Sequence, residues 1–432
     1  MRRRQTFVMV RGPASGVARA YLQGMARSPL TPSFWRSPLR GPWLTSVLGV
    51  VLLGGITLLF VTGLLSYAAY NPDLSPVNDK TPDKGVLGLY LFSWPTDPHW
   101  LYRLTQGVHV TLGITLIPVL LAKLWSVVPK LFTLPPARSL AHALERISLL
   151  LLVGGALFEF VTGVLNVQLD YVFPGSFYPL HFYGAWVFFA AFVAHAVLKM
   201  PLALRNLRQL REEKTELVSP DPAEPTVSRR GALWFVGGGS LLLFLTTVGQ
   251  GFDGVLRRTA LFAPHGGADP ASGPNGFQIN KTAAYAGIDQ VETSEEAWRL
   301  VVVGRANRTV RLSRADLLRL PLHSSALPIA CVEGWSTSDQ WWRGVRLRDL
   351  AALVGYEDDP PDLFVESLQR HGAFRRAALR ANQVADPRSL LALSVNGEDL
   401  TPDHGHPARI IVPAAPGVLN TKWVARLTFG DL

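Results

Sequence analysis

The chain is poor in cysteine and in charged residues. Cys331 is the only cysteine among 432 residues, and charged side chains account for 17% of the chain. A single cysteine excludes an internal disulfide framework. Cys331 is therefore either a small buried hydrophobic residue or a thiolate that binds a metal or attacks a substrate. The scarcity of charge, alongside 48% hydrophobic residues, indicates membrane-spanning segments.

Acidic residues are missing from the N-terminus, where basic ones gather. The first 41 residues carry eight arginines and no aspartate or glutamate, and further basic clusters lie at 123–146 and 199–230. These clusters alternate with segments of little or negative net charge, which is the positive-inside pattern of a membrane protein. The net charge of +10 therefore indicates membrane orientation and not nucleic-acid binding.

Five apolar runs are long enough to cross about 30 Å of hydrocarbon as helices. They lie near 43–67, 104–128, 146–167, 179–199 and 232–250. The basic clusters predict a multi-pass protein of the cell (inner) membrane, with a cytoplasmic N-terminus and an extracytoplasmic segment 252–432.

A short repeat links the first and third apolar runs. The sequence "FVTGLL" occupies 60–65 and "FVTGVL" occupies 160–165, each near the outer end of its predicted helix. The repeat predicts two helix pairs related by an axis along the membrane normal, and convergence on a common apolar hexamer is the alternative. Gly63 and Gly163 would let a flat ligand or a neighbouring helix approach closely.

Histidines on the second and fourth predicted helices indicate a cofactor. His109 and His181 hold comparable places in the two pairs, and imidazoles that face each other across a four-helix bundle are axial ligands of b-type haem. Alternatively, each histidine hydrogen-bonds a neighbouring helix or sits at the membrane interface. His195 follows His181 by 14 residues, a spacing that resembles di-haem cytochrome b subunits such as the membrane subunit of formate dehydrogenase. The first helix has no histidine to pair with His195, so one haem is predicted and a second stays open.

The segment between the fourth and fifth helices is charged and rich in proline, as expected of a cytoplasmic linker. Its end, "SRRG" at 228–231, precedes a glycine-rich apolar helix and resembles a twin-arginine export signal. Such a signal would send the last domain across the membrane already folded. Ordinary inner-side positive charge is the alternative.

The last 181 residues, 252–432, have the alternation of short strands and helices that is typical of an α+β domain. The stretch 298–313 predicts a hairpin that turns around Gly304–Asn307. Ser313 is a candidate N-cap of a short helix, and Gly355 ends another helix. Strands are expected in "ARIIVP" and "KWVARLTF".

Motifs in this last segment resemble the sulfite-oxidase-type molybdopterin domain. They are "CVEGWS" (331–336), "VESLQ" (365–369), "SVNGEDL" (394–400) and the stretch that begins "HGHPARIIVP" (404–413). The resemblance is greatest to the branch that contains the bacterial periplasmic protein-methionine-sulfoxide reductase catalytic subunit. It implies that Cys331 ligates molybdenum, whose dithiolene pterin leaves room for one soft protein thiolate. Three nearby tryptophans are expected to pack in the core: Trp335, Trp341 and Trp342.

The resemblance also implies contacts to the pterin. Arg409 and Lys422 match basic positions that would meet its phosphate. His404 and Ser367 fall at further cofactor-contacting positions, and Asn280 is a weaker match because its spacing to Cys331 is short. A surface ion pair is the alternative for the two basic residues, and a hydrogen-bonded loop histidine is the alternative for His404.

Together these features predict a multi-domain protein, an all-α transmembrane bundle of about five helices plus an α+β sulfite-oxidase-like molybdopterin-binding domain. The predicted parts are a basic cytoplasmic N-terminus (1–41), a four-helix cytochrome b-like membrane domain (42–200), a linker (201–230), a fifth transmembrane helix (231–251) and the molybdopterin domain (252–432).

The predicted function is a molybdopterin-dependent oxidoreductase that exchanges electrons between a quinone pool, b-type haem and a molybdenum centre. That centre would transfer an oxygen atom to or from a small oxyanion or an S- or N-oxide, free or protein-bound, with S- or N-oxide reduction favoured. The alternatives are a sulfite-type dehydrogenase that delivers electrons to quinone, and a cofactor-free membrane receptor or assembly protein. The sequence indicates no oligomeric state.

Overall fold

A computed structural model describes most of the chain. The described residues are 37, 39–83, 90, 92–128, 139–167, 172–208, 227–261, 276–279 and 281–432. Nearly all of the predicted N-terminal segment, most of the predicted linker and Asn280 lie outside them.

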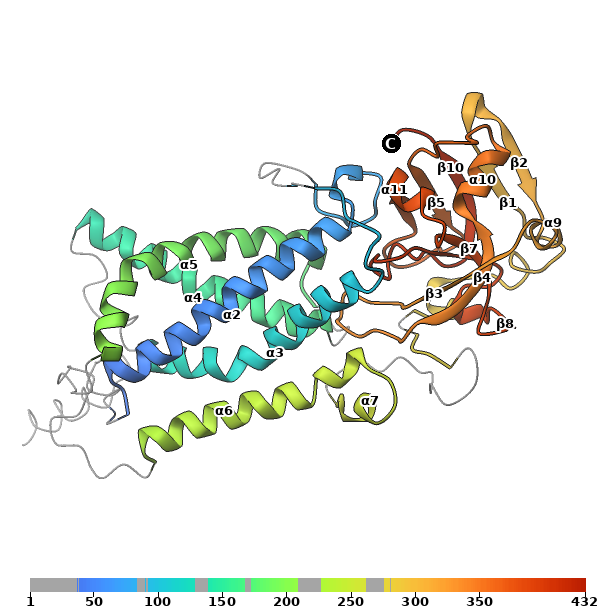
Figure 1. Cartoon of the computed structure of the whole chain (residues 1–432). Helices are drawn as coiled ribbons and strands as arrows, with labels where there is room; N and C mark the ends of the chain where they lie inside the picture. The colour runs from blue at the N-terminus through green and yellow to red at the C-terminus, as the bar shows by residue number, and fades with distance from the viewer. Residues whose placement is uncertain are drawn as a thin grey trace, which may run out of the picture. The chain divides into compact units, whose positions relative to one another are not determined.

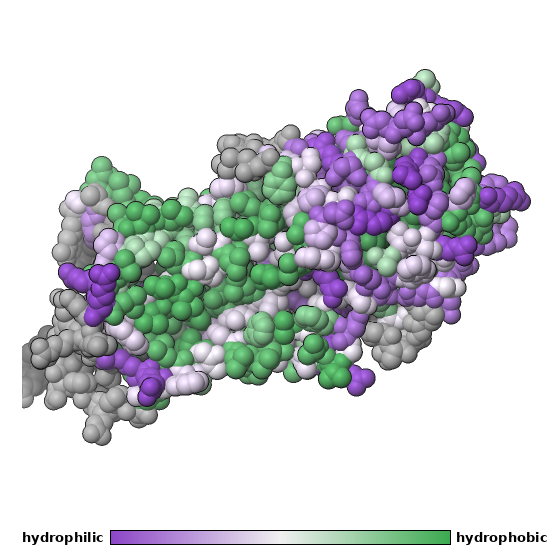
Figure 2. All heavy atoms as spheres, viewed as in Figure 1, coloured by the Kyte–Doolittle hydropathy of each residue, from purple (hydrophilic) through white to green (hydrophobic). Residues whose placement is uncertain are grey.

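Long helices form the first part of the chain (Figure 1). The described residues include five that are long and apolar enough to cross a membrane: α2 (Pro42–Ala69), α3 (Leu101–Val127), α4 (Leu140–Val167), α5 (Phe177–Arg208) and α6 (Arg229–Leu245, with the span continuing to Gly251). Each overlaps one of the predicted apolar runs. Figure 2 shows hydrophobic side chains over these helices and hydrophilic ones over the sheets, as expected of helices that face hydrocarbon.

Helix α5 is longer than predicted. It continues through Pro201 to Arg208, into the segment expected as a linker, with Arg205 and Arg208 in its last turn. A proline in a helix interior removes one backbone hydrogen bond without always ending the helix. The predicted boundary at 200 rests on the charged, proline-rich composition of 201–230, and of that segment Pro201, Arg205 and Arg208 lie in the helix.

The chain folds into two compact units. One combines the segment that ends at Gly54 with Pro118–Gly154 and Ala190–Gly239, and the other combines Gly55–Ile117, Gly155–Phe189 and Ser240–Leu432. In the first unit, Lys123 Nζ donates to the Thr45 carbonyl (2.6 Å).

The second unit contains two sheets. Sheet A has the order β2-β1-β10-β5-β6, and sheet B has the order β3-β4-β7-β8 with β9 also paired to β7. The strands are β1 (Leu300–Val303), β2 (Thr309–Leu312), β3 (His323–Leu327), β4 (Gln340–Arg346), β5 (Leu363–Ser367), β6 (Arg376–Leu379), β7 (Leu390–Val395), β8 (Glu398–Asp399), β9 (Arg409–Ile411) and β10 (Val424–Phe429). Only the β1–β10 pair among them is parallel.

The local predictions for this domain are confirmed. Strands β1 and β2 form an antiparallel hairpin. Ser313 caps helix α9 (Arg314–Arg319) in a capping box with Asp316, so two otherwise unpaired helix-end donors are satisfied. Helix α10 (Leu347–Leu353) is followed by Gly355 at φ +96°, a conformation that glycine adopts without strain.

The segment after α2 packs on the domain that carries the sheets. Asn71 Nδ2 donates to Gln383 Oε1 (2.8 Å), and both side chains are fully buried. Trp94 Nε1 donates to the Ala414 carbonyl (2.7 Å). Buried hydrogen bonds of this kind fix the helix ends of the second unit to the domain, because separating them would leave buried polar groups unpaired.

Candidate functional site

Cys331 lies in a tight loop beyond β3. Its backbone N–H donates to the Trp335 carbonyl (2.9 Å), and an isolated bridge between Ala330 and Ser336 closes the loop. The side chain is 4% exposed and lines a cavity of about 650 Å³, a volume that includes space open to solvent. The loop thus holds one thiol at the wall of a polar cavity, which we call the Cys331 cavity.

Three cationic side chains line the same cavity: Lys281, Arg409 and Lys422. Burial lowers the pKa of Arg409 to about 9 and that of Lys281 to about 8. Burial, followed by the positive charges of Arg409 and Lys281, also lowers the pKa of Lys422 well below its usual value. A group of buried cations that disfavour one another is stabilised by an anion in the cavity.

Several hydrogen-bonding atoms in the cavity wall have no partner within the described part of the chain. They are Arg409 Nε, Asn420 Nδ2 and Thr421 Oγ1. The other two nitrogens of the Arg409 guanidinium donate to the carbonyls of His404 (3.0 Å) and Asn420 (3.2 Å), which fixes its orientation. Unpaired buried donors are costly unless a ligand meets them. Together with the cations, they fit a phosphorylated, polar cofactor such as molybdopterin.

The surroundings of Cys331 favour metal ligation over nucleophilic attack. Burial, and then the negative charge of Glu333, raises the pKa of the Cys331 thiol well above its usual value. Reactive cysteines have depressed pKa values, so a thiolate at this place needs a directly bonded cation. No group of three or more His, Cys, Asp or Glu side chains that could hold a metal occurs among the described residues. A metal that brings its own organic ligand, as molybdenum does in molybdopterin, would need only the one protein thiolate that Cys331 can supply.

Two further predicted cofactor contacts, His404 and Ser367, differ in whether they line the cavity. His404 lines it, but its Nδ1 pairs with Thr401 Oγ1 (2.9 Å) and its Nε2 with the Phe277 carbonyl (3.2 Å), so protein groups occupy both ring nitrogens. Burial, and then the Arg409 charge, lowers the His404 pKa to about 4. Ser367 donates to the Lys422 carbonyl (2.7 Å) and positions that residue from behind the cavity.

The tryptophan prediction is correct for two of the three side chains. Trp335 and Trp342 are buried, and Trp335 also lines the Cys331 cavity. Trp341 is 57% exposed, so the expectation that it packs in the core is wrong. Neighbouring residues of strand β4 point to opposite faces of the sheet, and the face of Trp341 is the open one.

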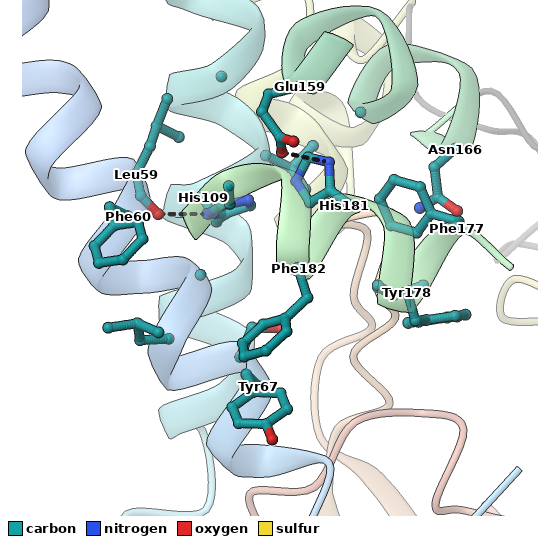
Figure 3. A pocket seen from close by; sticks show the side chains of 18 of the residues that line it. Leu59, Phe60, Tyr67, His109, Glu159, Asn166, Phe177, Tyr178, His181 and Phe182 are labelled. Atoms are coloured by element: carbon teal, nitrogen blue, oxygen red, sulfur yellow. Dashed lines mark hydrogen bonds and ion pairs between the residues drawn. The ribbon is translucent and has the colours of Figure 1, made fainter. Parts of the chain in front are cut away.

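A second cavity gathers around His109 and His181, and we call it the histidine cavity. It encloses about 1320 Å³ not occupied by atoms, including space open to its surroundings, and its lining is mainly apolar and aromatic. Figure 3 shows the two imidazoles facing each other across it, and their ring centroids lie 6.4 Å apart. That separation leaves room for one metal ion between the rings, and the predicted pair is brought together.

Each of these histidines is oriented through its Nδ1 atom. His109 Nδ1 lies 3.0 Å from the Leu59 carbonyl, and His181 Nδ1 lies 2.9 Å from Glu159 Oε2 (Figure 3). A metal-binding histidine characteristically donates its second ring N–H to a carbonyl or a carboxylate, which fixes the tautomer. Both Nε2 atoms are thereby left to act as acceptors towards a metal.

The internal repeat explains this arrangement. Thr62 Oγ1 lies 3.0 Å from His109 Nδ1, and Thr162 Oγ1 lies 3.3 Å from His181 Nδ1. A Cβ atom added to Gly63 would lie 3.3 Å from His109 Cε1. The Thr-Gly pair of each repeat therefore receives the imidazole of the neighbouring helix. The glycines admit a histidine ring, so of the two predicted roles the structure supports approach by a neighbouring helix.

Glu159 is a site residue that the sequence analysis missed. It occupies the place that Leu59 has in the first copy of the repeat, and its side chain is buried. Its Oε1 atom has no hydrogen-bond partner within the described ranges, and it lies against Gly184 of α5, where an added Cβ would clash. The available signal was a carboxylate in the middle of an apolar helix, which marks a functional position by default.

His195 does not line the histidine cavity. It lies on α5 in the first compact unit, whereas His181 lies in the second. Of the three predicted haem-ligand histidines, His109 and His181 line one cavity and His195 does not.

Comparison with known proteins finds relatives of the segment that contains Cys331. Residues 286–431 match the family described as "Oxidoreductase molybdopterin binding domain". The chain is 32% identical over 132 residues to "Uncharacterized oxidoreductase YuiH" of Bacillus subtilis, a match that covers 31% of this chain and 65% of that protein. It is 31% identical over 156 residues to mitochondrial sulfite oxidase of Mus musculus, with 30% of this chain and 29% of that protein covered.

A third relative is the protein-methionine-sulfoxide reductase catalytic subunit MsrP of Campylobacter jejuni. It is 25% identical over 166 residues, which are 35% of this chain and 55% of that protein. The chain thus spans less than two thirds of each of these relatives. Residues 286–431 are a sulfite-oxidase-like molybdopterin-binding domain, and the proteins of this family are enzymes.

Proposed function

We propose that this molybdopterin-binding oxidoreductase domain is anchored in the cell membrane by its helices and exchanges electrons with a quinone pool through one b-type haem. The proposed reaction is oxygen-atom transfer at molybdenum, with reduction of an S- or N-oxide as the favoured direction. The N-terminus would be cytoplasmic and the domain from 252 onward extracytoplasmic. The proposed parts of the chain are those derived from the sequence, with the fourth helix extended to Arg208.

The observation that carries this proposal is the pair of cavities within one compact unit. One holds a buried thiol beside cations and unpaired donors, and the other holds two oriented imidazoles. Cys331 lines the first cavity, and the next residue in the chain, Val332, lines the second. The two cavities are lined by adjacent residues of the chain, which supports electron exchange between the groups that we propose they hold.

In the Cys331 cavity, side chains of the protein would bind the molybdenum cofactor and orient it. Cys331 would supply the single protein ligand, while Arg409, Lys281 and Lys422 would hold the pterin phosphate. The molybdenum cofactor, when bound, supplies two-electron oxygen-atom transfer. Overall, a sulfoxide loses its oxygen as its S–O bond breaks, and two electrons and two protons convert that oxygen to water.

In the histidine cavity, His109 and His181 would hold the haem iron, and the apolar wall would exclude water. Haem, when bound, supplies one-electron storage. A quinol releases two electrons and two protons as it becomes a quinone, so two successive one-electron passages balance the removal of one oxygen atom.

The reverse direction is the second candidate. The similarity to sulfite oxidase supports a dehydrogenase that oxidises sulfite or a related anion and sends two electrons to quinone. The buried cations of the Cys331 cavity suit either an anionic substrate or the pterin phosphate.

The deciding experiment starts with metal and haem analysis of the purified full-length protein. About one molybdenum and one b-type haem per chain are expected. The reduced haem band is then followed after addition of sulfoxides and N-oxides, and the oxidised band after addition of sulfite. Loss of the reduced band with an S- or N-oxide supports the favoured direction, and reduction by sulfite supports the second.

A Cys331→Ser variant provides the matched test of the metal ligand. It should lose substrate-driven oxidation of the haem while keeping its haem spectrum, since position 331 lies outside the histidine cavity. Turnover at the rate of the unmodified protein in this variant would refute the proposal. Absence of molybdenum and haem from correctly folded protein would instead support a receptor or assembly role.

A further inference from the structure

The loop that carries Cys331 touches the helix that carries His109. Gln106 Nε2 of α3 donates to the Val332 carbonyl (2.5 Å). Gln106 and Val110 are four residues apart and are neighbours on one face of the helix, and Gln106 is also three residues from His109, so it neighbours the imidazole-bearing position as well. Both are buried, at 4% and 7% exposed. The loop therefore rests on the helical turn that holds the imidazole.

Glycine at position 334 makes this contact possible. Gly334 has φ +91°, and a Cβ atom added to it would lie 2.6 Å from Val110 Cβ and 2.8 Å from Gln250 Nε2. Distances this short between carbon atoms force a displacement of the loop or of the helix. Gly334 is thus needed twice, for its backbone conformation and for its close approach to α3.

Aromatic side chains form a second part of the wall between the cavities. Tyr178 lines the histidine cavity and Phe374 lines the Cys331 cavity, and their ring centroids lie 5.1 Å apart. This ring contact is an alternative route for electrons between the two cavities. It is made of non-bonded rings, whereas the loop provides covalent bonds and one short hydrogen bond.

We propose that the segment Cys331–Gly334, which we call the ligand loop, is the electron route between the two cavities, running from the Cys331 thiolate through Val332 to the Gln106–Val110 turn and His109. The inference rests on the proposed function and adds the residues that connect its two centres. Electrons cross one at a time, two crossings for each oxygen atom transferred, with quinol as the reductant in the favoured direction.

The test substitutes Gly334→Ala and uses Gly397→Ala as its control. Gly397 has φ +90°, and an added Cβ at that position would have nothing within 4 Å. The two substitutions therefore place alanine at nearly the same positive φ, and only the first brings a Cβ atom against α3. Both variants are purified full-length with their cofactors, and molybdenum and haem contents are measured first.

The expected result is slower oxidation of pre-reduced haem by substrate in Gly334→Ala by about tenfold or more, in the way that displacements of about 1 Å slow geometry-dependent steps. Gly397→Ala should keep the unmodified rate. Independently of activity, hydrogen exchange at 331–336 should accelerate in Gly334→Ala alone. Magnetic relaxation of the molybdenum signal by the haem iron should weaken in that variant.

A second variant, Gln106→Leu, covers the case in which Gly334→Ala does not fold. It removes the hydrogen bond to Val332 and leaves the backbone unchanged, and a slower rate with retained haem is expected. Unchanged rates in both variants, with both cofactors present and the unmodified protein active, overturn the proposed route but not the proposed function. The route is also overturned by equal slowing in Gly397→Ala, or by slowing in Phe374→Leu with an unchanged rate in Gly334→Ala.

Discussion

His181 and Glu159 form a buried imidazole–carboxylate pair, with 2.9 Å between Nδ1 and Oε2 (Figure 3). The equivalent histidine of the first repeat, His109, pairs with a neutral backbone carbonyl, that of Leu59. The two proposed haem ligands therefore differ in the charge of the group that contacts the Nδ1 atom. A carboxylate behind a metal-binding imidazole makes that ligand more basic and favours the more positive oxidation state of the metal.

The Glu159→Gln variant should retain haem and raise its midpoint potential. Each tenfold loss of preference for the oxidised state corresponds to about 59 mV for one electron, so a rise of tens of millivolts is expected. Spectroelectrochemical titration of purified protein measures the shift, with the exposed Glu296→Gln as control. An unchanged potential in Glu159→Gln would show that the carboxylate does not act on the haem.

Removal of either proposed axial ligand should remove the haem. His109→Ala and His181→Ala are each expected to lose the reduced b-type absorption band, because no other histidine lines the cavity as described. His195→Ala should keep the band, since His195 lies outside that cavity. A spectrum retained in the first two variants and lost in the third would identify a different ligand pair.

The Arg409→Lys variant should bind pterin less tightly. Lysine keeps the positive charge but lacks Nε and the planar fork that the His404 and Asn420 carbonyls orient. Loss of a hydrogen bond to a charged group costs about 1.5–3 kcal/mol. Pterin released from purified protein and measured by its fluorescence should fall in this variant. Arg343→Lys, at an exposed position on β4, should leave the pterin content unchanged.

The contact between the 71–97 segment and the domain should depend on Asn71. Asn71→Ala removes a buried hydrogen bond to Gln383, with an expected loss of about 1–3 kcal/mol. Hydrogen exchange at 376–385 should accelerate accordingly. Asp97→Ala breaks an ion pair with Arg388 in which the aspartate is 77% exposed, and it should have little effect, because surface ion pairs contribute about 0–1 kcal/mol. Equal protection in the Asn71→Ala variant would contradict this assignment.

Short-range patterns in the sequence were sufficient to locate the apolar helices and the local elements of the C-terminal domain. Length and composition located the five apolar helices, turn residues located the β1–β2 hairpin, and Ser313 located the start of α9. These features depend on residues close together in the chain, so their patterns are legible without a structure. The pairing of His109 with His181 also followed from the sequence, because a repeat transfers the geometry of one helix pair to the other.

The tertiary structure determined which residues far apart in the sequence contact one another. Glu159 became a partner of His181 only when α4 and α5 packed together, and Trp341 faced outward because its strand has one open face. The contact of Gly334 with Val110 joins positions more than two hundred residues apart. No local pattern encodes such a contact, because it depends on how the domain and the helix ends of the second unit pack against each other.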